Sequence, residues 1–168
     1  GEHDITCADG SVRTCELHAS FTKDNLIVTF TDVTERNAAL ERLLLKDLVF
    51  ASTISANSIA DSSGVITDAN TAFLELWGYV RKSEVVGKPI SDFVDSEEDA
   101  LRIVGALEQD DEWRGHYVAR RKDGTTFVAS SLSSVLRDKS GEPVGYQSSV
   151  VDATATFEAH QALKEQTR

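Results

Sequence analysis

Three stretches near the C-terminal end of the sequence alternate hydrophobic residues with small or polar ones, as β-strands do. They cover residues 113–121, 125–136 and 144–151. Asp123-Gly124 joins the first two, and Asp-Gly between extended segments is a strong hairpin signal because glycine accepts the positive φ of a tight turn. The pattern therefore predicts three consecutive antiparallel strands that end at Asp152-Ala153-Thr154.

Shorter periodic segments precede these strands. Residues 57–61 and 65–67 have the composition of two short strands around a Ser-Ser-Gly turn. Asn70 is placed to cap a short helix that stops at Gly78. Asp95 with Glu98 predicts the start of a longer helix to about residue 109, with one apolar stripe formed by Ala100, Leu101, Val104 and Leu107. Together the segments predict an α+β fold with a one-sided antiparallel sheet.

Residues 1–34 repeat the end of the chain in a shorter form. Asp9-Gly10 precedes a predicted strand at 12–21, a turn at 23–25, a strand at 26–30 and then Asp32-Val33-Thr34. The same order of Asp-Gly, strand, turn, strand and Asp-x-Thr occurs at residues 123–154. We therefore expect residues 1–34 to be the C-terminal hairpin of a similar, preceding module.

A linker helix is predicted at residues 35–52. Asp32 and Glu35 form a capping-box-like pair, and Leu40, Leu43, Leu44 and Leu48 recur at helical spacing. Leu45 and Val49 widen the apolar face beyond one seam. Two interpretations stay open: packing onto a sheet alone, or an additional contact with a second copy through Leu40, Leu44 and Leu48. Residues 155–168 are predicted to form an exit helix.

Composition and charge narrow the functional classes. The 168 residues carry a formal net charge of −11, which argues against nucleic-acid binding. The sequence contains no run of about 18 apolar residues, so no membrane-spanning helix is predicted. Cys7 and Cys15 lack metal or haem spacing, so we expect reduced thiols in a cytoplasmic protein, with a disulfide between them as the alternative.

Residue patterns for catalysis or metal binding are not found. The four histidines are scattered without a ligand motif, so no metal site is predicted. The serines between Ser130 and Ser134 lie outside any Gly-x-Ser-x-Gly elbow, and we do not expect an enzyme. Small side chains there either leave room for a ligand cavity or let helices pack closer to the sheet.

The motifs from residue 53 to 154 together resemble a PAS domain. They include Gly64-Val65-Ile66-Thr67-Asp68-Ala69-Asn70, Leu76-Trp77-Gly78-Tyr79, Trp113-Arg114-Gly115-His116 and Asp152-Ala153-Thr154. The resemblance implies five strands in the order 2-1-5-4-3, with short helices cupping one face. It also implies a sensor or relay module of a multi-domain signalling protein, such as a histidine kinase of a two-component system. Ala153 and Ala155 depart from the usual family residues, which predicts a weaker helix cap.

The resemblance also suggests where a ligand and a signal would lie. The cavity candidates are Phe73, Trp77, Leu101, Val104, Trp113, Tyr117, Ser130, Leu132 and Ser148, and the candidate relay residues are Asp152 and Thr154. Residues 53–154 contain no cysteine for a flavin photoadduct, and residues 95–109 no histidine for haem. We therefore predict no cofactor and a colourless protein. Non-covalent flavin, stacked on Trp77 or Trp113, is the alternative.

We expect the chain to divide into four segments and to form one kind of assembly. The segments are a hairpin at 1–34, a linker helix at 35–52, a PAS domain at 53–154 and an exit helix at 155–168. We expect a homodimer through the linker helix and the N-terminal hairpin, with a small-molecule ligand as a further partner. A ligand-free dimerisation module is the main alternative, and a flavin redox sensor or part of an enzyme are weaker ones.

Overall fold

The computed structural model describes residues 1–166, and the chain divides into two compact units between Val49 and Phe50. The first unit contains a three-stranded antiparallel sheet in the order β1-β2-β3. Its strands are β1 (Glu2–Thr6), β2 (Val12–Phe21) and β3 (Leu26–Asp32). Strands β2 and β3 were expected. Strand β1 was not, because Glu2–Thr6 contains a single apolar residue and shows no period-two pattern.

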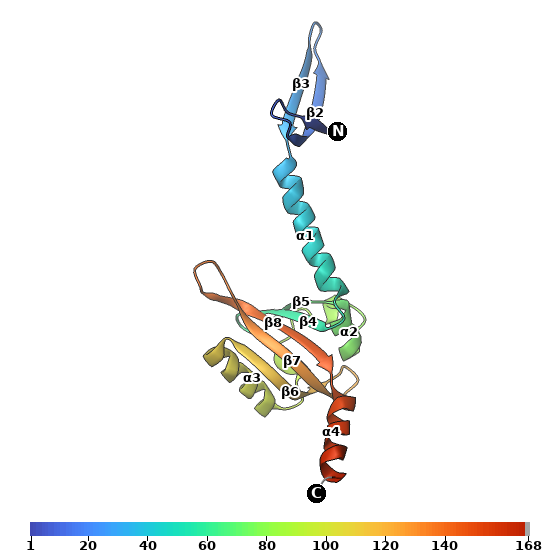
Figure 1. Cartoon of the computed structure of the whole chain (residues 1–168), viewed down its shortest axis with the longest axis vertical. Helices are drawn as coiled ribbons and strands as arrows, with labels where there is room; N and C mark the ends of the chain where they lie inside the picture. The colour runs from blue at the N-terminus through green and yellow to red at the C-terminus, as the bar shows by residue number, and fades with distance from the viewer. Residues whose placement is uncertain (167–168) are drawn as a thin grey trace. The chain divides into compact units, whose positions relative to one another are not determined.

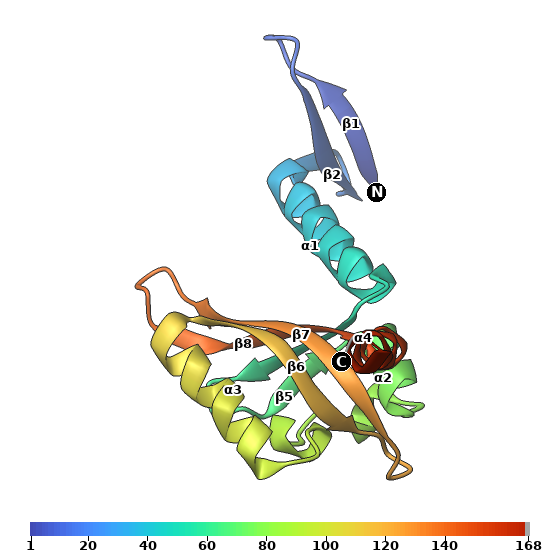
Figure 2. The ribbon, with the colours of Figure 1, turned by 60° about the horizontal axis from the view of Figure 1, so that its bottom comes forward.

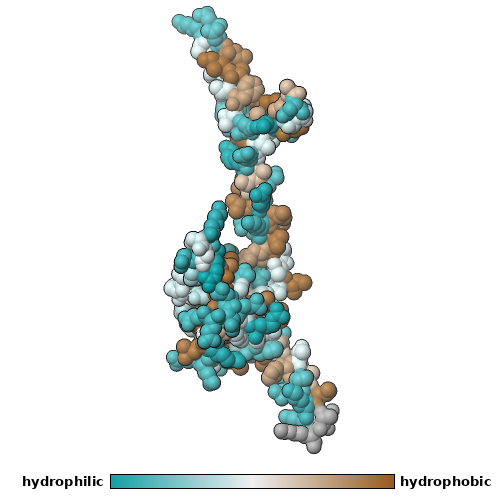
Figure 3. All heavy atoms as spheres, turned by 60° about the vertical axis from the view of Figure 1, so that its left-hand side comes forward, coloured by the Kyte–Doolittle hydropathy of each residue, from teal (hydrophilic) through white to brown (hydrophobic). Residues whose placement is uncertain are grey.

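Helix α1 (Thr34–Ser52) follows the first sheet. It begins two residues after the expected Asp32, whose Oδ1 instead accepts a hydrogen bond from Thr34 N at 3.0 Å. No side chain of α1 is buried. Figure 3 shows hydrophobic atoms at the surface in this part of the chain, in agreement with the exposed leucines of α1.

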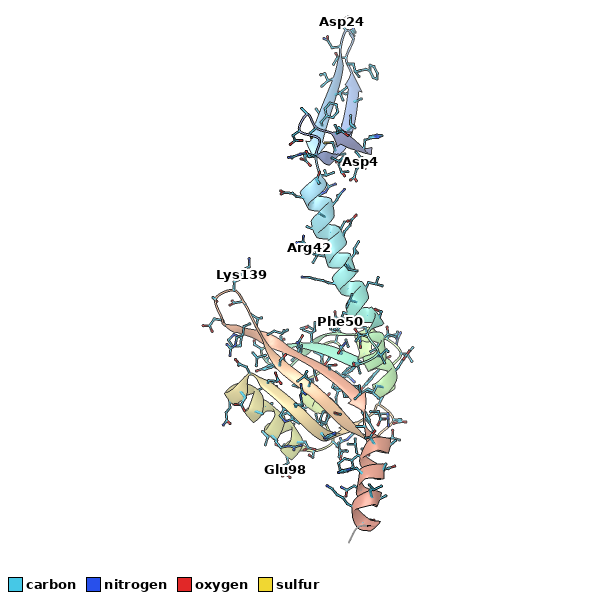
Figure 4. All side chains as sticks on the ribbon, viewed as in Figure 1. Asp4, Asp24, Arg42, Phe50, Glu98 and Lys139 are labelled. Atoms are coloured by element: carbon cyan, nitrogen blue, oxygen red, sulfur yellow. The ribbon has the colours of Figure 1, made fainter. Side chains whose placement is uncertain are left out.

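The second unit is built on a five-stranded sheet in the order β5-β4-β8-β7-β6, which confirms the expected order (Figure 1). Its strands are β4 (Ala56–Asp61), β5 (Ile66–Ala69), β6 (Glu112–Arg120), β7 (Thr126–Arg137) and β8 (Pro143–Asp152). All four neighbouring pairs are antiparallel. Lys139 lies at the tip of the β7–β8 turn, as Asp24 lies at the tip of the β2–β3 turn (Figure 4).

Helices cover one face of this sheet (Figure 2). They are α2 (Thr71–Trp77), the 3₁₀ turns η1 (Lys82–Glu84) and η2 (Ile90–Phe93), and α3 (Glu97–Asp110). Asn70 caps α2 by accepting from Phe73 N, and Gly78 ends it at φ 75°, both as predicted. The cap of α3 is Ser96, not Asp95, because Ser96 Oγ accepts from Asp99 N at 3.1 Å.

The inner face of α3 differs from the predicted stripe. Ile103 and Leu107 are buried, whereas Leu101 is 65% exposed. One buried core joins these two side chains to α2, η2 and the inner face of the sheet, and it includes Phe73, Trp77, Phe93, Trp113 and Phe127. The helical layer is therefore held to the sheet by aromatic and aliphatic packing.

Helix α4 (Thr154–Gln166) leaves the second sheet at the end of β8. The Phe157 ring lies 6.1 Å from the His116 ring, on the face of β6 that points away from the helical layer. Residues 167 and 168 of the predicted exit helix lie outside the described residues. Between residues 1 and 166, no helix has the length and apolar content needed to cross a membrane.

The strands β1–β3 repeat the hydrogen bonds of β6–β8. Cys7 N donates to Ser11 O at 2.8 Å, and Arg121 N donates to Thr125 O at 2.8 Å. Val33 N donates to Thr14 O at 2.9 Å, and Ala153 N donates to Val128 O at 2.8 Å. The side chains of the two Asp-x-Thr corners also match: Thr34 Oγ1 accepts from Thr14 N at 2.9 Å, and Thr154 Oγ1 accepts from Val128 N at 3.0 Å.

The pairing register of the two sheets is also the same. Leu17 pairs with Phe30, Ala19 with Val28 and Phe21 with Leu26. The equivalent pairs in the second unit are Ser131 with Val150, Ser133 with Ser148 and Val135 with Tyr146. The second set faces the helical layer, whereas Phe21, Leu26, Val28 and Phe30 of the first set are exposed.

Candidate functional site

A cavity of about 110 Å³ lies between the second sheet and its helical layer. Helices α2 and α3 and the turn η2 supply one wall, with Phe73, Trp77, Phe93 and Ile103 among its residues. Strands β4, β7 and β8 supply the floor. No Asp, Glu, Lys, Arg or His side chain lines the cavity.

The aromatic wall is a rigid cluster. The rings of Phe73 and Trp77 stack with centroids 4.2 Å apart and planes at 16°, and Phe93 meets Phe73 edge-on at 5.3 Å. Trp77 Nε1 donates to Phe93 O at 3.3 Å, which satisfies the indole inside the core. A ligand would therefore meet fixed ring surfaces along this wall.

The floor carries a cluster of serine hydroxyls. Ser58, Ser148 and Ser133 pair directly across β4, β8 and β7, so their side chains share one face of the sheet. Ser131 lies two residues along β7 on that face. The Oγ atoms of Ser131, Ser133 and Ser148 form a triangle with sides of 3.2, 3.0 and 2.9 Å.

Tyr117 lines the cavity beside this cluster and is 9% exposed. It pairs with Ala129 on β7, which makes Tyr117 a diagonal neighbour of Ser131. Burial raises the pKa of the Tyr117 hydroxyl, so the group stays protonated throughout the physiological range. Its hydroxyl makes no hydrogen bond to any residue between 1 and 166.

The structure places five of the nine expected cavity residues on its lining: Phe73, Trp77, Val104, Tyr117 and Ser148. Leu101, Trp113, Ser130 and Leu132 do not line it. Leu101 points to solvent from α3, and Trp113, a residue of β6, is buried in the core. Ser130 and Leu132 lie on the opposite face of β7, because adjacent strand residues alternate between faces.

Sequence reasoning missed Ser131 and Ser133, both buried, along with Ile103 of α3. The missing information was the phase of β7. Phe127, Ala129, Ser131 and Ser133 alternate as inward residues. The large Phe127 could have fixed this phase, because a lone aromatic residue on a half-buried strand most often faces the core.

The expected relay residues form a closed corner at the start of α4. Asp152 Oδ1 accepts from Thr154 N at 2.9 Å and from Thr154 Oγ1 at 2.6 Å. Thr154 Oγ1 in turn accepts from Val128 N of β7 at 3.0 Å. The first turn of α4 is thus tied to the adjacent strand.

Arg121 links this corner to the cavity wall and was not singled out from the sequence. Its Nη2 donates to Asp152 Oδ2 at 2.9 Å, and its Nε donates to Leu76 O at 2.9 Å. Leu76 belongs to α2, the helix that also carries Phe73 and Trp77. One guanidinium therefore connects a helix of the cavity wall to the beginning of α4.

The charge on Asp152 is stabilised in this corner. Partial burial acts to raise the pKa of the Asp152 carboxyl, but hydrogen bonds from Thr154 and the positive charge of Arg121 outweigh it and hold the pKa below its usual value. The equivalent Asp32 has a pKa lowered to about 2 by hydrogen bonds from Arg13 and Thr34.

A second hub lies at Asn70, which is 2% exposed. Its Oδ1 accepts from Asn57 N and Phe73 N, both at 2.9 Å. Its Nδ2 donates to the carbonyl groups of Phe50 at 3.1 Å and Ser55 at 3.0 Å. Asn70 therefore fastens the last turn of α1 to the start of α2, beyond the capping role expected from the sequence.

A comparison with known protein families identifies the family of the second unit. A family model described as PAS domain matches residues 55–155, more than half of the chain. The chain belongs to the PAS domain family, as the motifs at 53–154 predicted. No curated protein matches the sequence.

Solved structures agree with this fold. The PAS domain of a protein from Colwellia psychrerythraea shares 24% identity, with 68% of this chain and 98% of that chain covered and a TM-score of 0.63. A light-oxygen-voltage domain studied with a flavin analogue shares 27% identity over 77% of this chain and 99% of that one, with a TM-score of 0.58. A PAS domain from a two-component sensor histidine kinase shares 16% identity over 68% and 98%, also with a TM-score of 0.58.

Between residues 1 and 166, no group of three or more His, Cys, Asp or Glu side chains is arranged to hold a metal ion. Cys7 and Cys15 are free thiols.

Proposed function

We propose that residues 53–154 act as a sensor or relay module of a multi-domain signalling protein. A small ligand in the cavity would change the packing of α2, and Arg121 would pass that change to α4. The observation that carries this proposal is the pair of Arg121 hydrogen bonds, one to Leu76 O and one to Asp152 Oδ2. The likeness to a PAS domain of a sensor histidine kinase supports a signalling context.

The proposed role is binding and conformational change rather than catalysis. A serine nucleophile needs a neighbouring base. The three clustered serines contact one another, and no histidine or carboxylate lines their cavity. We place the protein in the cytoplasm because its two cysteines are free thiols.

Flavin is the less suitable ligand, although one similar structure is a light-oxygen-voltage domain. Residues 53–154 have no cysteine that could form a photoadduct. The cavity volume of about 110 Å³ is also too small for a three-ring flavin. A colourless preparation remains our expectation.

We further propose a parallel homodimer through α1. Leu40, Leu44 and Leu48 recur at helical spacing and are 55%, 59% and 63% exposed. Such a stripe suits a second copy of the helix. The same observation favours the main alternative function, a dimerisation module that binds no ligand.

Residues 1–34 we assign to the end of a second PAS-like module. The support is the matched hydrogen bonds and register of β1–β3 and β6–β8. The apolar face of β2 and β3 corresponds to the helix-covered face of β7 and β8.

A cavity-filling substitution tests the relay without any ligand. Ser133→Leu places extra atoms in the cavity, and we expect hydrogen exchange at the Phe157 amide, which donates to Ala153 O, to change by about tenfold. Ser134→Leu, on the outer face of β7, is the matched control. Adding Arg121→Gln should abolish the effect. Equal exchange in Ser133→Leu and Ser134→Leu would mean that the cavity and α4 are not coupled.

A further inference from the structure

The hydroxyl groups of the cavity floor have unused hydrogen-bonding capacity of a defined kind. Each serine hydroxyl has one donor and two acceptor positions. In the triangle of Ser131, Ser133 and Ser148, either hydroxyl of each pair can donate, so three hydrogens can occupy the three sides and leave each oxygen one free lone pair. The intact triangle can therefore accept a hydrogen bond from a ligand without losing one of its own.

Tyr117 supplies the complementary group. Its side chain is 9% exposed and lines the cavity, and its hydroxyl is unpaired among the described residues. No buried side-chain polar atom of the described residues lacks a partner, so this unpaired hydroxyl lies at the open space of the cavity, where a ligand can accept its hydrogen. As a diagonal neighbour of Ser131, it lies roughly 7–8 Å from that residue at the backbone, so one small group between them could reach both.

Size and charge restrict what can occupy this space. A 150 Å³ apolar cavity in an engineered lysozyme takes up benzene, and the cavity here is about 110 Å³. A ligand is thus limited to roughly one small ring or a short alkyl chain. An ionic group would enter without a counter-charge, because no charged side chain lines the walls.

We propose that this cavity binds a small neutral hydroxyl compound, a phenol or a short-chain alcohol. Its hydroxyl donates to the Ser131–Ser133–Ser148 triangle and accepts from Tyr117. Its apolar part packs against Phe73, Ile103 and Val150. The assignment names the ligand of the proposed sensory function and rests on it.

Phenol and toluene are matched probes, because they share a ring and differ chiefly in the hydroxyl group. Each is titrated into the full chain, and the amide NMR shifts of residues 131–133 and 148–150 report binding. Phenol should bind about tenfold or more tightly than toluene, since its hydroxyl gains one hydrogen bond to the serine triangle and one from Tyr117 inside the cavity. Tyr117→Phe should reduce this ratio to near one with little effect on toluene, while Ser134→Ala on the outer face should leave it unchanged.

The outcomes separate the ligand from the relay. Equal affinity of phenol and toluene, or an unchanged ratio in Tyr117→Phe, overturns the hydroxyl assignment. Failure of both probes to bind also overturns it, and the relay then still stands if Ser133→Leu alters exchange in α4. If phenol binds selectively but Ser133→Leu leaves hydrogen exchange in α4 unchanged, the ligand assignment is supported and the relay is contradicted.

Discussion

The indole of Trp113 lies directly over the Cα of Gly115, two residues along the same strand. A methyl group at Gly115 would lie 2.8 Å from Trp113 Cζ2, well inside contact distance. Trp113 is buried, and its ring also packs against Tyr117 at 6.0 Å between centroids. The missing side chain at Gly115 therefore leaves room for the Trp113 ring.

This contact predicts opposite effects for two Gly→Ala substitutions. Gly115→Ala forces the buried Trp113 to move, and we expect a loss of about 1–3 kcal/mol in the free energy of unfolding. Gly105→Ala in α3 meets no atom within 4 Å and should stabilise the protein by about 0.5–1 kcal/mol. Urea denaturation of both variants checks the signs, and stabilisation by Gly115→Ala would contradict the packing described.

Thr154→Val tests the corner at the start of α4. The substitution keeps the side-chain shape but leaves Val128 N without its acceptor, so we expect a loss of about 1–3 kcal/mol. Thr156→Val, two residues along α4 and exposed, is the control and should change stability by less than about 0.5 kcal/mol. Thermal unfolding measures both. Equal losses in the two variants would show that the hydrogen bond from Val128 N to Thr154 Oγ1 does not stabilise the protein.

Acid should loosen the same corner. The pKa of Asp152 is lower in the folded protein than in the unfolded chain, so its stabilising contribution is present above the unfolded value of about 3.9 and is lost as pH falls through the folded value. The difference in stability between the wild type and Asp152→Asn should accordingly shrink below about pH 4. A difference that stays constant from pH 7 to pH 2 would exclude this carboxylate as the cause.

The exposed stripe of α1 predicts the oligomeric state. Leu44→Glu with Leu48→Glu should convert dimers to monomers, because two charges per helix would be buried without partners. Ala39→Glu with Arg42→Glu, on the opposite side of α1, should leave the dimer intact. Sedimentation equilibrium gives the masses. A dimer that persists in the leucine variant must use another surface.

The apolar face of the first sheet predicts concentration-dependent protection. Phe21 is 82% exposed and Phe30 is 59% exposed, more than a three-stranded sheet can leave in water without a partner. We expect amide protection in β2 and β3 to rise with protein concentration, through pairing between chains, while protection in β7 stays constant. Hydrogen exchange over a dilution series measures this, and protection of β2 that survives dilution to monomer would exclude the pairing.

Local signals in the sequence predicted most of the second unit. Asp123-Gly124 marked the hairpin, Asn70 and Gly78 marked the ends of α2, and the Asp-x-Thr motif marked the start of α4. These features depend on backbone geometry that a few neighbouring residues determine. The order of the five strands came from family resemblance, because pairing between distant strands leaves no local signature.

The cavity was predicted less well for two physical reasons. A strand of small residues such as Ser130–Ser134 carries no size contrast, so its inward face cannot be assigned by eye, and a shift of one residue exchanges the faces. Helix α3 has enough apolar residues for two stripes, and tertiary packing selected Ile103 over Leu101. Arg121 was overlooked because both of its partners, Leu76 O and Asp152, are distant in sequence.

The hydrogen bonds from Asn70 Nδ2 to the carbonyl groups of Phe50 and Ser55 restrict the length of chain that can join the end of α1 to β4. Only residues 53–55 separate the end of α1 from β4, and Asn70 holds both sides of that gap. One residue inserted at 53–55 would move at least one of these carbonyl groups away from Asn70 and leave a donor of its buried amide without a partner, at a cost of about 1–3 kcal/mol. The three residues that connect α1 to β4 are therefore as intolerant of insertion as positions of the core, although they form a connecting segment between two elements.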